Sequence, residues 1–390
     1  MMKPLFRKAA IIPADDCDGK RKIKPGKVFG LCPVRHIMLL AGSAITGLFF
    51  LLRDNRVLMN AVSEGFVRPY HRLLGRICNV IPWSAAELFY AVVILAVLAE
   101  LTICGIRFFR KKAGWQFVYR SIVSLLTCGA VLYGGYCLLW GVYYYSDSFA
   151  EKIGLETRPV AVEELETVTK LFADYANDYS GQVMRDDAGV FTCDTDSLLA
   201  RSATLYTAAV AEYPELDGPA LRAKPMVFSR FMSWINFTGF FFPFTGEANL
   251  NMDAPLCLLP ATVAHELAHQ RGVSGEDEAN FVAVLAGMSS NDTEYIYSTA
   301  LLAYIHLGNA LYEADYDRWL AVYMTLNDAV QADLQANNAY WEQYETKAAE
   351  ASEAVYTGFL QSYGEERGMR SYGACVDLLV AYYGDGMTGK

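Results

Sequence analysis

The segment Val263-Ala264-His265-Glu266-Leu267-Ala268-His269 contains two histidines and a glutamate in the order HExxH. Residues four apart on an α-helix lie one turn apart on the same face, so the imidazoles of His265 and His269 can bind one metal ion. Glu266 lies beside them, where a carboxylate can act as general base. Pro260 suits the first turn of such a helix and Gly272 suits its C-terminal stop.

The next segment supplies candidates for a third ligand, because a catalytic zinc site has three protein ligands and one open position. Ser274-Gly275-Glu276-Asp277 has the capping-box pattern that begins a second helix. Glu276 shares a helix face with small residues, which permit close approach to the first helix, whereas Glu278 lies toward larger apolar residues. Glu276 is therefore the favoured third ligand and Glu278 the alternative. Asn280 is expected to hydrogen-bond an imidazole.

Three apolar stretches precede this region, and each is close to the ~20 residues that a helix needs to cross a bilayer. They run over Ile37 to Leu52 with a possible extension to Cys32, over Ser84 to Ile106, and over Ser121 to Tyr143. The aromatic residues that end the third stretch, among them Trp140, are typical of an interfacial belt. We predict a tail over 1–30, three spanning helices within 31–146 and a separate domain over 147–390.

Charge divides the chain at the same point. Residues 1–146 have a net charge of +12 and residues 147–390 a net charge of −22. Lys and Arg concentrate in the N-terminal tail and in the connection around Arg107 to Arg120, which predicts that both are cytoplasmic. The acidic domain is then extracytoplasmic, on a multi-pass protein of the cell membrane. Its lack of clustered Lys and Arg argues against nucleic acid as a partner, and the wide spacing of Cys193, Cys257 and Cys375 argues against thiolate ligation.

The acidic domain reads as mostly helical. Apolar residues recur at helical spacing over Glu163 to Tyr179, over Thr195 to Tyr213 and through much of Asp292 to Tyr383. Between Met226 and Leu259 an aromatic run is followed by Thr245-Gly246-Glu247, which indicates a small sheet or an extended edge segment. The expected fold class is mainly α: three transmembrane helices followed by an α-rich α+β domain with a small sheet.

Two further residues are candidates for substrate contact. His306, or one of the nearby Tyr295, Tyr297 and Tyr304, can supply the oxyanion stabiliser that hydrolysis needs, although core packing is the favoured interpretation of His306. Glu247 can line a substrate cleft beside the aromatic run, as a strand edge that pairs with extended peptides. A plain turn role for Glu247 is equally consistent with the sequence.

HELAHQRG followed by EDEANF resembles the zincin metallopeptidases, in the gluzincin arrangement in which a downstream acidic residue joins HExxH. The spacing here is shorter than in most gluzincins. A metzincin interpretation fails, because Gly275 stands where the third histidine of that pattern belongs.

The whole chain resembles more closely an uncharacterised bacterial family of membrane proteins. The matching features are the three spans, Trp140-Gly141, the segment from Phe242 to Asn249, HELAHQRG with EANF, and Ser371-Tyr372-Gly373. This resemblance implies a zincin-like domain with a zinc site of the peptidase kind, and no known substrate.

The expected function is a membrane-anchored, Zn²⁺-dependent hydrolase that acts on a peptide or protein outside the membrane, with Glu266 as general base. Two alternatives remain at this point. One is a non-catalytic zinc-binding sensor or scaffold, although a purely structural site has no need of a base at position 266. The other is an amidase of cell-wall peptides, which shares the chemistry and differs in substrate.

Overall fold

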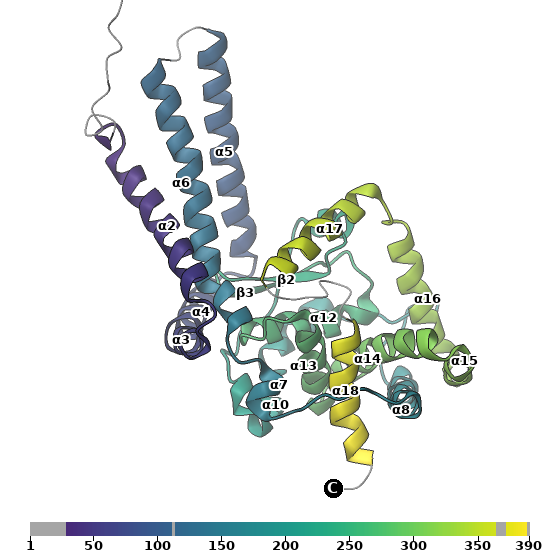
Figure 1. Ribbon diagram of the computed structural model, residues 1–390. Helices are drawn as coiled ribbons and strands as arrows, with labels where there is room; N and C mark the ends of the chain where they lie inside the picture. The colour runs from purple at the N-terminus through teal and green to yellow at the C-terminus, as the bar shows by residue number, and fades with distance from the viewer. Residues whose placement is uncertain (1–28, 111–113, 364–371, 388–390) are drawn as a thin grey trace, which may run out of the picture.

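The computed structural model describes residues 29–110, 114–363 and 372–387 and is mainly helical. Figure 1 shows three long helices projecting from one side of a globular part. They are α2 (Pro33–Leu52), α5 (Ala85–Phe109) and α6 (Trp115–Leu139), and all three are long and apolar enough to cross a membrane. The tail expected over 1–30 lies, apart from its last two residues, outside the described part of the chain.

The third long helix differs from its prediction. Helix α6 begins at Trp115 and ends at Leu139, and a 3₁₀ segment over Gly141–Tyr145 follows. Trp140 and Tyr143 are buried, and both contact residues of the globular part: Trp140 packs on Phe241 and Tyr143 on His71. The prediction of an interfacial aromatic belt at this end is therefore wrong. The chain turns into the domain here, and the aromatic rings fill the junction.

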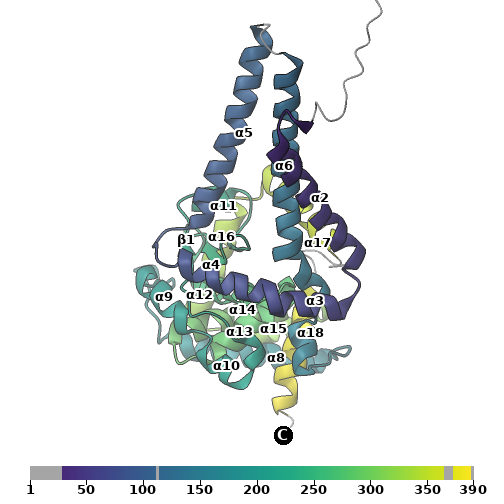
Figure 2. The ribbon, with the colours of Figure 1, turned by 90° about the vertical axis from the view of Figure 1, so that its left-hand side faces the viewer.

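The connection between the first two long helices is itself helical. It contains α3 (Arg56–Val62), a π-helical turn over Ser63–Val67, and α4 (Arg68–Cys78). Figure 2 shows α3 and α4 running across the lower ends of the long helices, between these and the rest of the globular part. Asn55 caps α3 by accepting a hydrogen bond from the Leu58 backbone N–H.

A three-stranded sheet lies within the predicted aromatic region, with strand order β1-β3-β2. Strands β2 (Gly239–Phe242) and β3 (Glu247–Leu250) form an antiparallel hairpin, and β1 (Lys224–Pro225) pairs with β3 in parallel. Phe242 is opposite Glu247 and Gly239 is opposite Leu250. The expectation of a small sheet between Met226 and Leu259 is confirmed for β2 and β3, whereas both residues of β1 lie just before that range.

The main hydrophobic core of the globular part is helical, and the sheet lies at its edge. The principal helices of this core pack side by side below the sheet (Figure 1). Their bounds are α8 Val162–Ser180, α12 Leu259–Gln270, α13 Glu276–Ser289, α14 Thr293–Ala314 and α18 Tyr372–Met387. Shorter helices surround them: α7 Phe149–Ile153, α9 Thr195–Arg201, α10 Thr207–Glu212, α11 Ser229–Trp234, α15 Tyr316–Tyr323, α16 Asp328–Glu342 and α17 Lys347–Ser362.

The helix expected over Glu163 to Tyr179 is confirmed as α8. The helix expected over Thr195 to Tyr213 is broken into α9 and α10 by a 3₁₀ turn over Ser202–Thr204. The buried Ser202 hydroxyl donates to the Leu199 carbonyl and accepts from the Ala223 N–H, so the break connects this segment to the chain that leads into β1. A side-chain hydroxyl that bonds the backbone in this way competes with a regular helix.

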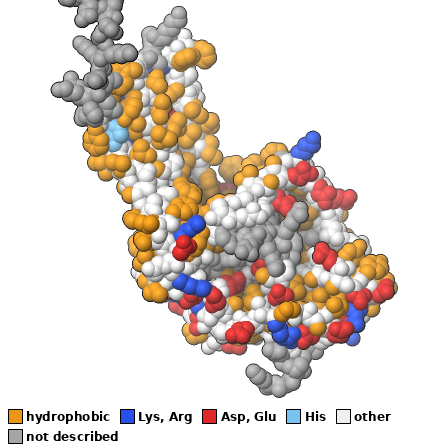
Figure 3. All heavy atoms as spheres, in the orientation of Figure 1, with side chains coloured by type: hydrophobic (Ala, Val, Ile, Leu, Met, Phe, Trp, Pro, Cys, Tyr) orange, Lys and Arg blue, Asp and Glu red, His pale blue; other side chains and the backbone are white. Residues whose placement is uncertain are grey.

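Figure 3 shows how side-chain types divide between the two parts of the molecule. Apolar side chains cover the projecting helices, while acidic side chains are scattered over the globular part. This distribution agrees with the charge division in the sequence.

Candidate metal centre

Helix α12 holds Glu266 and His269 in buried positions and His265 in a half-buried one. Pro260 occupies its first turn, as expected, and the chain reverses at Gly272, where φ is +90°. A β-carbon at Gly272 would lie 2.7 Å from the Tyr143 ring, so glycine is required by both conformation and space. The reversal brings α13 directly against α12.

The start of α13 differs in detail from the capping-box prediction. The helix begins at Glu276, with Gly275 as its N-cap residue and no side-chain cap. Glu276, Asp277 and Glu278 occupy the first turn, where the helix dipole favours negative charge. Ser274 therefore precedes the helix without capping it.

The two imidazoles and one carboxylate converge on a single point. His265 Nε2 lies 3.2 Å from Glu276 Oε2, and His269 Nε2 lies 3.6 Å from the same oxygen. One donor atom from each of the three residues lies within 4.8 Å of the others. The imidazole rings are 4.6 Å apart between centroids and nearly perpendicular. Two nitrogens and one carboxylate oxygen at this separation suit a zinc ion, with a coordination position left for water or substrate.

A hydrogen bond on the far side of each of the three side chains fixes its orientation. His265 Nδ1 lies 2.8 Å from Asn280 Oδ1, and His269 Nδ1 lies 2.6 Å from the Val273 carbonyl oxygen. Both acceptors require the proton on Nδ1, which leaves each Nε2 lone pair directed at the cluster. The Tyr356 hydroxyl donates to Glu276 Oε1 at 2.7 Å, so the other carboxylate oxygen is held as well. This arrangement fits a metal site better than a plain ion pair.

Glu266 is the most isolated polar group of the cluster. Its side chain is 3% exposed, and Oε2 has no hydrogen-bond partner among the described residues. A β-carbon added at Gly239 on β2 would lie 2.7 Å from Glu266 Oε1, so the carboxylate lies against the strand backbone. Burial raises the pKa of Glu266 to about 7, although the neighbouring imidazoles lower it. A carboxyl group with this pKa can accept and return a proton near neutral pH.

Glu276 and His269 each shift the pKa of the other. Burial raises the pKa of Glu276, but the imidazoles of His269 and His265 outweigh it and hold that pKa well below its usual range. Burial also disfavours a charged His269, yet the Glu276 carboxylate raises the pKa of the imidazole to about 9. The proton shared between these groups is the one that a divalent cation replaces on binding.

Two of the other candidate residues have contacts elsewhere. Glu278 accepts a hydrogen bond from the Ala150 N–H at 2.6 Å, so its carboxylate is turned toward α7 and away from the cluster. Glu247 accepts from the Ala85 and Ala86 N–H groups at the start of α5, at 3.3 and 3.1 Å. Glu247 thus caps the N-terminus of α5, which is a structural role and not contact with a substrate.

His306 is buried on α14, and the residues that the structure places near it include His265. Burial, followed by the charge of His265, lowers the pKa of His306 to about 4. Of the three tyrosines weighed with it, Tyr295 donates to the Leu198 carbonyl oxygen and Tyr297 to the Asp333 carboxylate. Neither hydroxyl is directed at the cluster.

Three residues that contact the site could not be predicted from the HExxH segment. Tyr356 reaches Glu276 from 80 residues along the chain. Trp140 packs edge-on against His269 with ring centroids 5.6 Å apart, and Gly239 makes room for Glu266. In the sequence, Trp140 stands out as an expected belt aromatic and Trp140-Gly141 as a family feature. Neither signal indicates the contact with His269, which depends on the tertiary fold.

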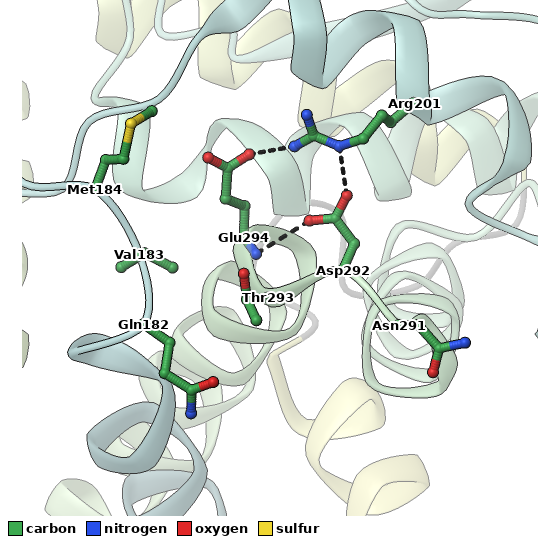
Figure 4. A pocket seen from close by; sticks show the side chains of 8 residues that line it. All are labelled: Gln182, Val183, Met184, Arg201, Asn291, Asp292, Thr293 and Glu294. Atoms are coloured by element: carbon green, nitrogen blue, oxygen red, sulfur yellow. Dashed lines mark hydrogen bonds and ion pairs between the residues drawn. The ribbon is translucent and has the colours of Figure 1, made fainter.

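A separate surface pocket of about 400 Å³ lies between the loop after α8, the end of α9 and the start of α14. Figure 4 shows Arg201 directed at Asp292 and Glu294 across it. The Arg201–Asp292 contact is 2.6 Å, and Glu294 makes a second ion pair with the same guanidinium. With its arginine already paired to two carboxylates, this pocket adds nothing to the chemistry of the cluster.

Comparison with known proteins assigns the chain to a family. It belongs to the family described as Protein of unknown function (DUF3810), whose profile matches residues 63–380. The matched range includes α4, two of the three long helices and the whole metal cluster. No curated protein and no solved structure matches the chain.

Proposed function

We propose that this protein is a membrane-anchored, zinc-dependent hydrolase that cleaves peptide bonds outside the cytoplasm. The observation that carries the proposal is the convergence of His265, His269 and Glu276 beside the buried Glu266 carboxylate, whose Oε2 has no hydrogen-bond partner in the described part of the chain. A structural zinc site is closed by four protein ligands and has no use for such a carboxylate. A catalytic site needs both the open position and the base.

His265, His269 and Glu276 would hold the zinc ion, and Asn280, Val273 and Tyr356 would fix their orientation. Zinc bound there supplies Lewis acidity, which makes a water molecule more acidic and polarises a carbonyl group. Glu266 accepts a proton from the attacking water and delivers it to the leaving amine. Its pKa of about 7 suits both steps, because neither protonation state is strongly favoured at neutral pH.

Strand β2 supports a peptide as substrate. It is at the edge of the described sheet, and Gly239 at its first position touches the Glu266 side chain. An extended peptide that pairs with the free edge of β2 would bring a backbone carbonyl close to the base. Proteins and cell-wall peptides both offer extended backbone of this kind, and the substrate within this class is a matter for experiment.

The test is a comparison of Glu266→Gln with the wild-type chain, both full length and reconstituted in liposomes. Each is incubated with a mixed peptide library, and the products are identified by mass spectrometry. The variant is expected to keep its zinc, since Glu266 is not a ligand, and to lose at least ~100-fold in cleavage rate, the usual effect of removing a general base.

Glu313→Gln is the matched control, because Glu313 is an exposed glutamate on α14. It should cleave as wild type does. Full activity in Glu266→Gln, or zinc bound without any cleavage by the wild-type chain, would contradict the proposal and favour a non-catalytic zinc protein.

A further inference from the structure

Helix α11 (Ser229–Trp234) buries two serines and Met232 and exposes both of its aromatic residues. Ser229 and Ser233 are buried, whereas Phe231 and Trp234 are 55% and 49% exposed. Val227 and Phe228, which lead into the helix, are 80% and 60% exposed. We refer to Val227, Phe228, Phe231 and Trp234 as the α11 face.

The buried serines explain why this orientation is fixed. The Ser229 hydroxyl donates to the Met226 carbonyl oxygen and accepts from the Met252 N–H. The Ser233 hydroxyl accepts from the side chains of Asn251 and Tyr340. Rotation of the helix to bury its aromatic rings would break these bonds and leave buried polar groups unsatisfied. The outward position of the α11 face is therefore built into the fold.

Hydrogen bonds fix the α11 face at the level where α5 begins. The Phe228 N–H donates to Glu87 Oε1 at 2.9 Å, and Glu87 lies in the first turn of α5. Lys224, on the strand just before the face, donates to the carbonyl oxygens of Cys78, the last residue of α4, and Ile81, in the loop that enters α5. Figure 2 shows α11 beside the lower turns of α5.

Apolar residues of that entry loop continue the same surface. Val80 is 83% exposed and Trp83 is 47% exposed. The sheet also reaches past the start of α5, because the Phe242 and Phe244 rings pack on Phe89 at 5.2 and 5.4 Å, one turn further along the helix. The domain thus extends alongside the first turns of α5.

We propose that the α11 face, with Val80 and Trp83, is a lipid-contact surface that inserts into the outer interfacial layer of the bilayer. Aromatic side chains prefer this layer, where their rings are partly removed from water. Arg230 is exposed on the same helix and suits lipid phosphate groups. The proposal follows from continuity with α5 as a spanning helix and does not depend on zinc or on hydrolysis.

The position of this surface has a consequence for the metal centre. Gly239, which touches Glu266, is only five residues beyond Trp234. Insertion of the α11 face would hold β2 and Glu266 beside the membrane surface, so substrates that are themselves attached to the bilayer would reach the site at a raised local concentration.

The test uses tryptophan fluorescence of the full chain in nanodiscs that hold one copy each. The lipid is phosphatidylcholine brominated in the upper part of its acyl chains, which quenches only nearby indoles. The emission of Trp234 is the difference in fluorescence between wild type and Trp234→Phe. The emission of Trp319 is the difference between wild type and Trp319→Phe. Trp319 is a half-buried indole on α15, on the far side of the globular part (Figure 1), and serves as the matched control.

Trp234 is expected to lose at least about half of its emission and Trp319 less than about a tenth, as interfacial insertion of one surface requires. Trp115→Phe, at the start of α6, reports on the spanning helices in the same way. Trp234 emission that is unquenched by lipid and accessible to iodide would overturn the proposal. So would emission protected from both quenchers, because protein would then cover the face. An unquenched Trp115 would overturn the proposal together with its membrane premise.

Discussion

Gly239 and Glu266 show how a single missing side chain prepares the site. Glu266 is buried without a hydrogen-bond partner, which costs about 1–3 kcal/mol for an ordinary polar group and more for a charged one. The unsatisfied atom is Glu266 Oε2, which lies beside the three converging side chains. Unsatisfied groups of this kind cluster at functional sites, where substrate or water completes their contacts.

Gly239→Ala is predicted to reduce turnover while leaving zinc in place. The new methyl group would lie 2.7 Å from Glu266 Oε1 and 2.8 Å from Cγ, so the carboxylate must shift. A misplacement of about 1 Å can lower a rate by ~100-fold, and we expect a loss of at least tenfold in kcat/KM. Gly181→Ala is the control, since a β-carbon there meets nothing within 4 Å. Unchanged kcat/KM in Gly239→Ala would mean that the position of the Glu266 carboxylate does not matter for catalysis.

Helix α4 connects the long helices to the sheet through a buried histidine. His71 is 1% exposed and packs edge-on against Phe241 with centroids 5.0 Å apart. Burial lowers its pKa to about 3, and neither ring nitrogen has a hydrogen-bond partner among the described residues. The folded protein therefore holds His71 neutral throughout the ordinary range of pH.

This pKa predicts a loss of stability in acid. Between pH 6.5 and about 3 the unfolded chain binds a proton at position 71 that the folded chain does not, so the free energy of unfolding falls as pH falls. The slope from this group approaches about 1.4 kcal/mol per pH unit. Thermal unfolding at pH 7 and pH 5 should show a smaller drop in Tm for His71→Phe than for the wild-type chain. Equal drops would mean that His71 is not held neutral.

Local sequence patterns predict which helices form better than they predict which residues those helices contact. The spacing in His265 to His269 gives the α12 face, and the periodicity from Glu163 to Tyr179 gives α8. In contrast, the interfacial belt was expected at Trp140 because aromatic residues after an apolar stretch commonly face lipid. Here Trp140 packs on His269, a contact between residues 129 positions apart. Tyr356 was missed for the same reason: nothing in its own segment indicates that its hydroxyl reaches Glu276.

At the scale of the whole molecule, the charge division and the three long helices predict how the protein is oriented in the membrane. We predict a cytoplasmic N-terminus and an extracytoplasmic globular part, since the positive charges lie before residue 147 and the acidic surplus after it. Protease added to intact spheroplasts should remove a tag fused after Lys390 and leave a tag before Met1 protected until the cells are lysed. The reverse pattern would place the metal centre in the cytoplasm and contradict the proposed location.

The family relation covers most of the molecule and includes the long helices together with the cluster. Contacts that join these parts near the site include Trp140 with His269, Tyr143 with Gly272, and Glu247 with the start of α5. The part of the chain that carries the long helices therefore supports the site directly. We accordingly expect the metal centre to depend on the full chain, which is the form that each experiment uses.

The most direct test of the central claim is the zinc content of the purified full-length protein after equilibration with zinc and removal of excess ion. The wild-type chain should retain about one zinc per molecule, as a site with three protein ligands requires. His265→Ala, His269→Ala and Glu276→Gln should each lose it, while Glu278→Gln should keep it. A wild-type chain without zinc, or ligand variants that bind it as well as wild type, would contradict the account.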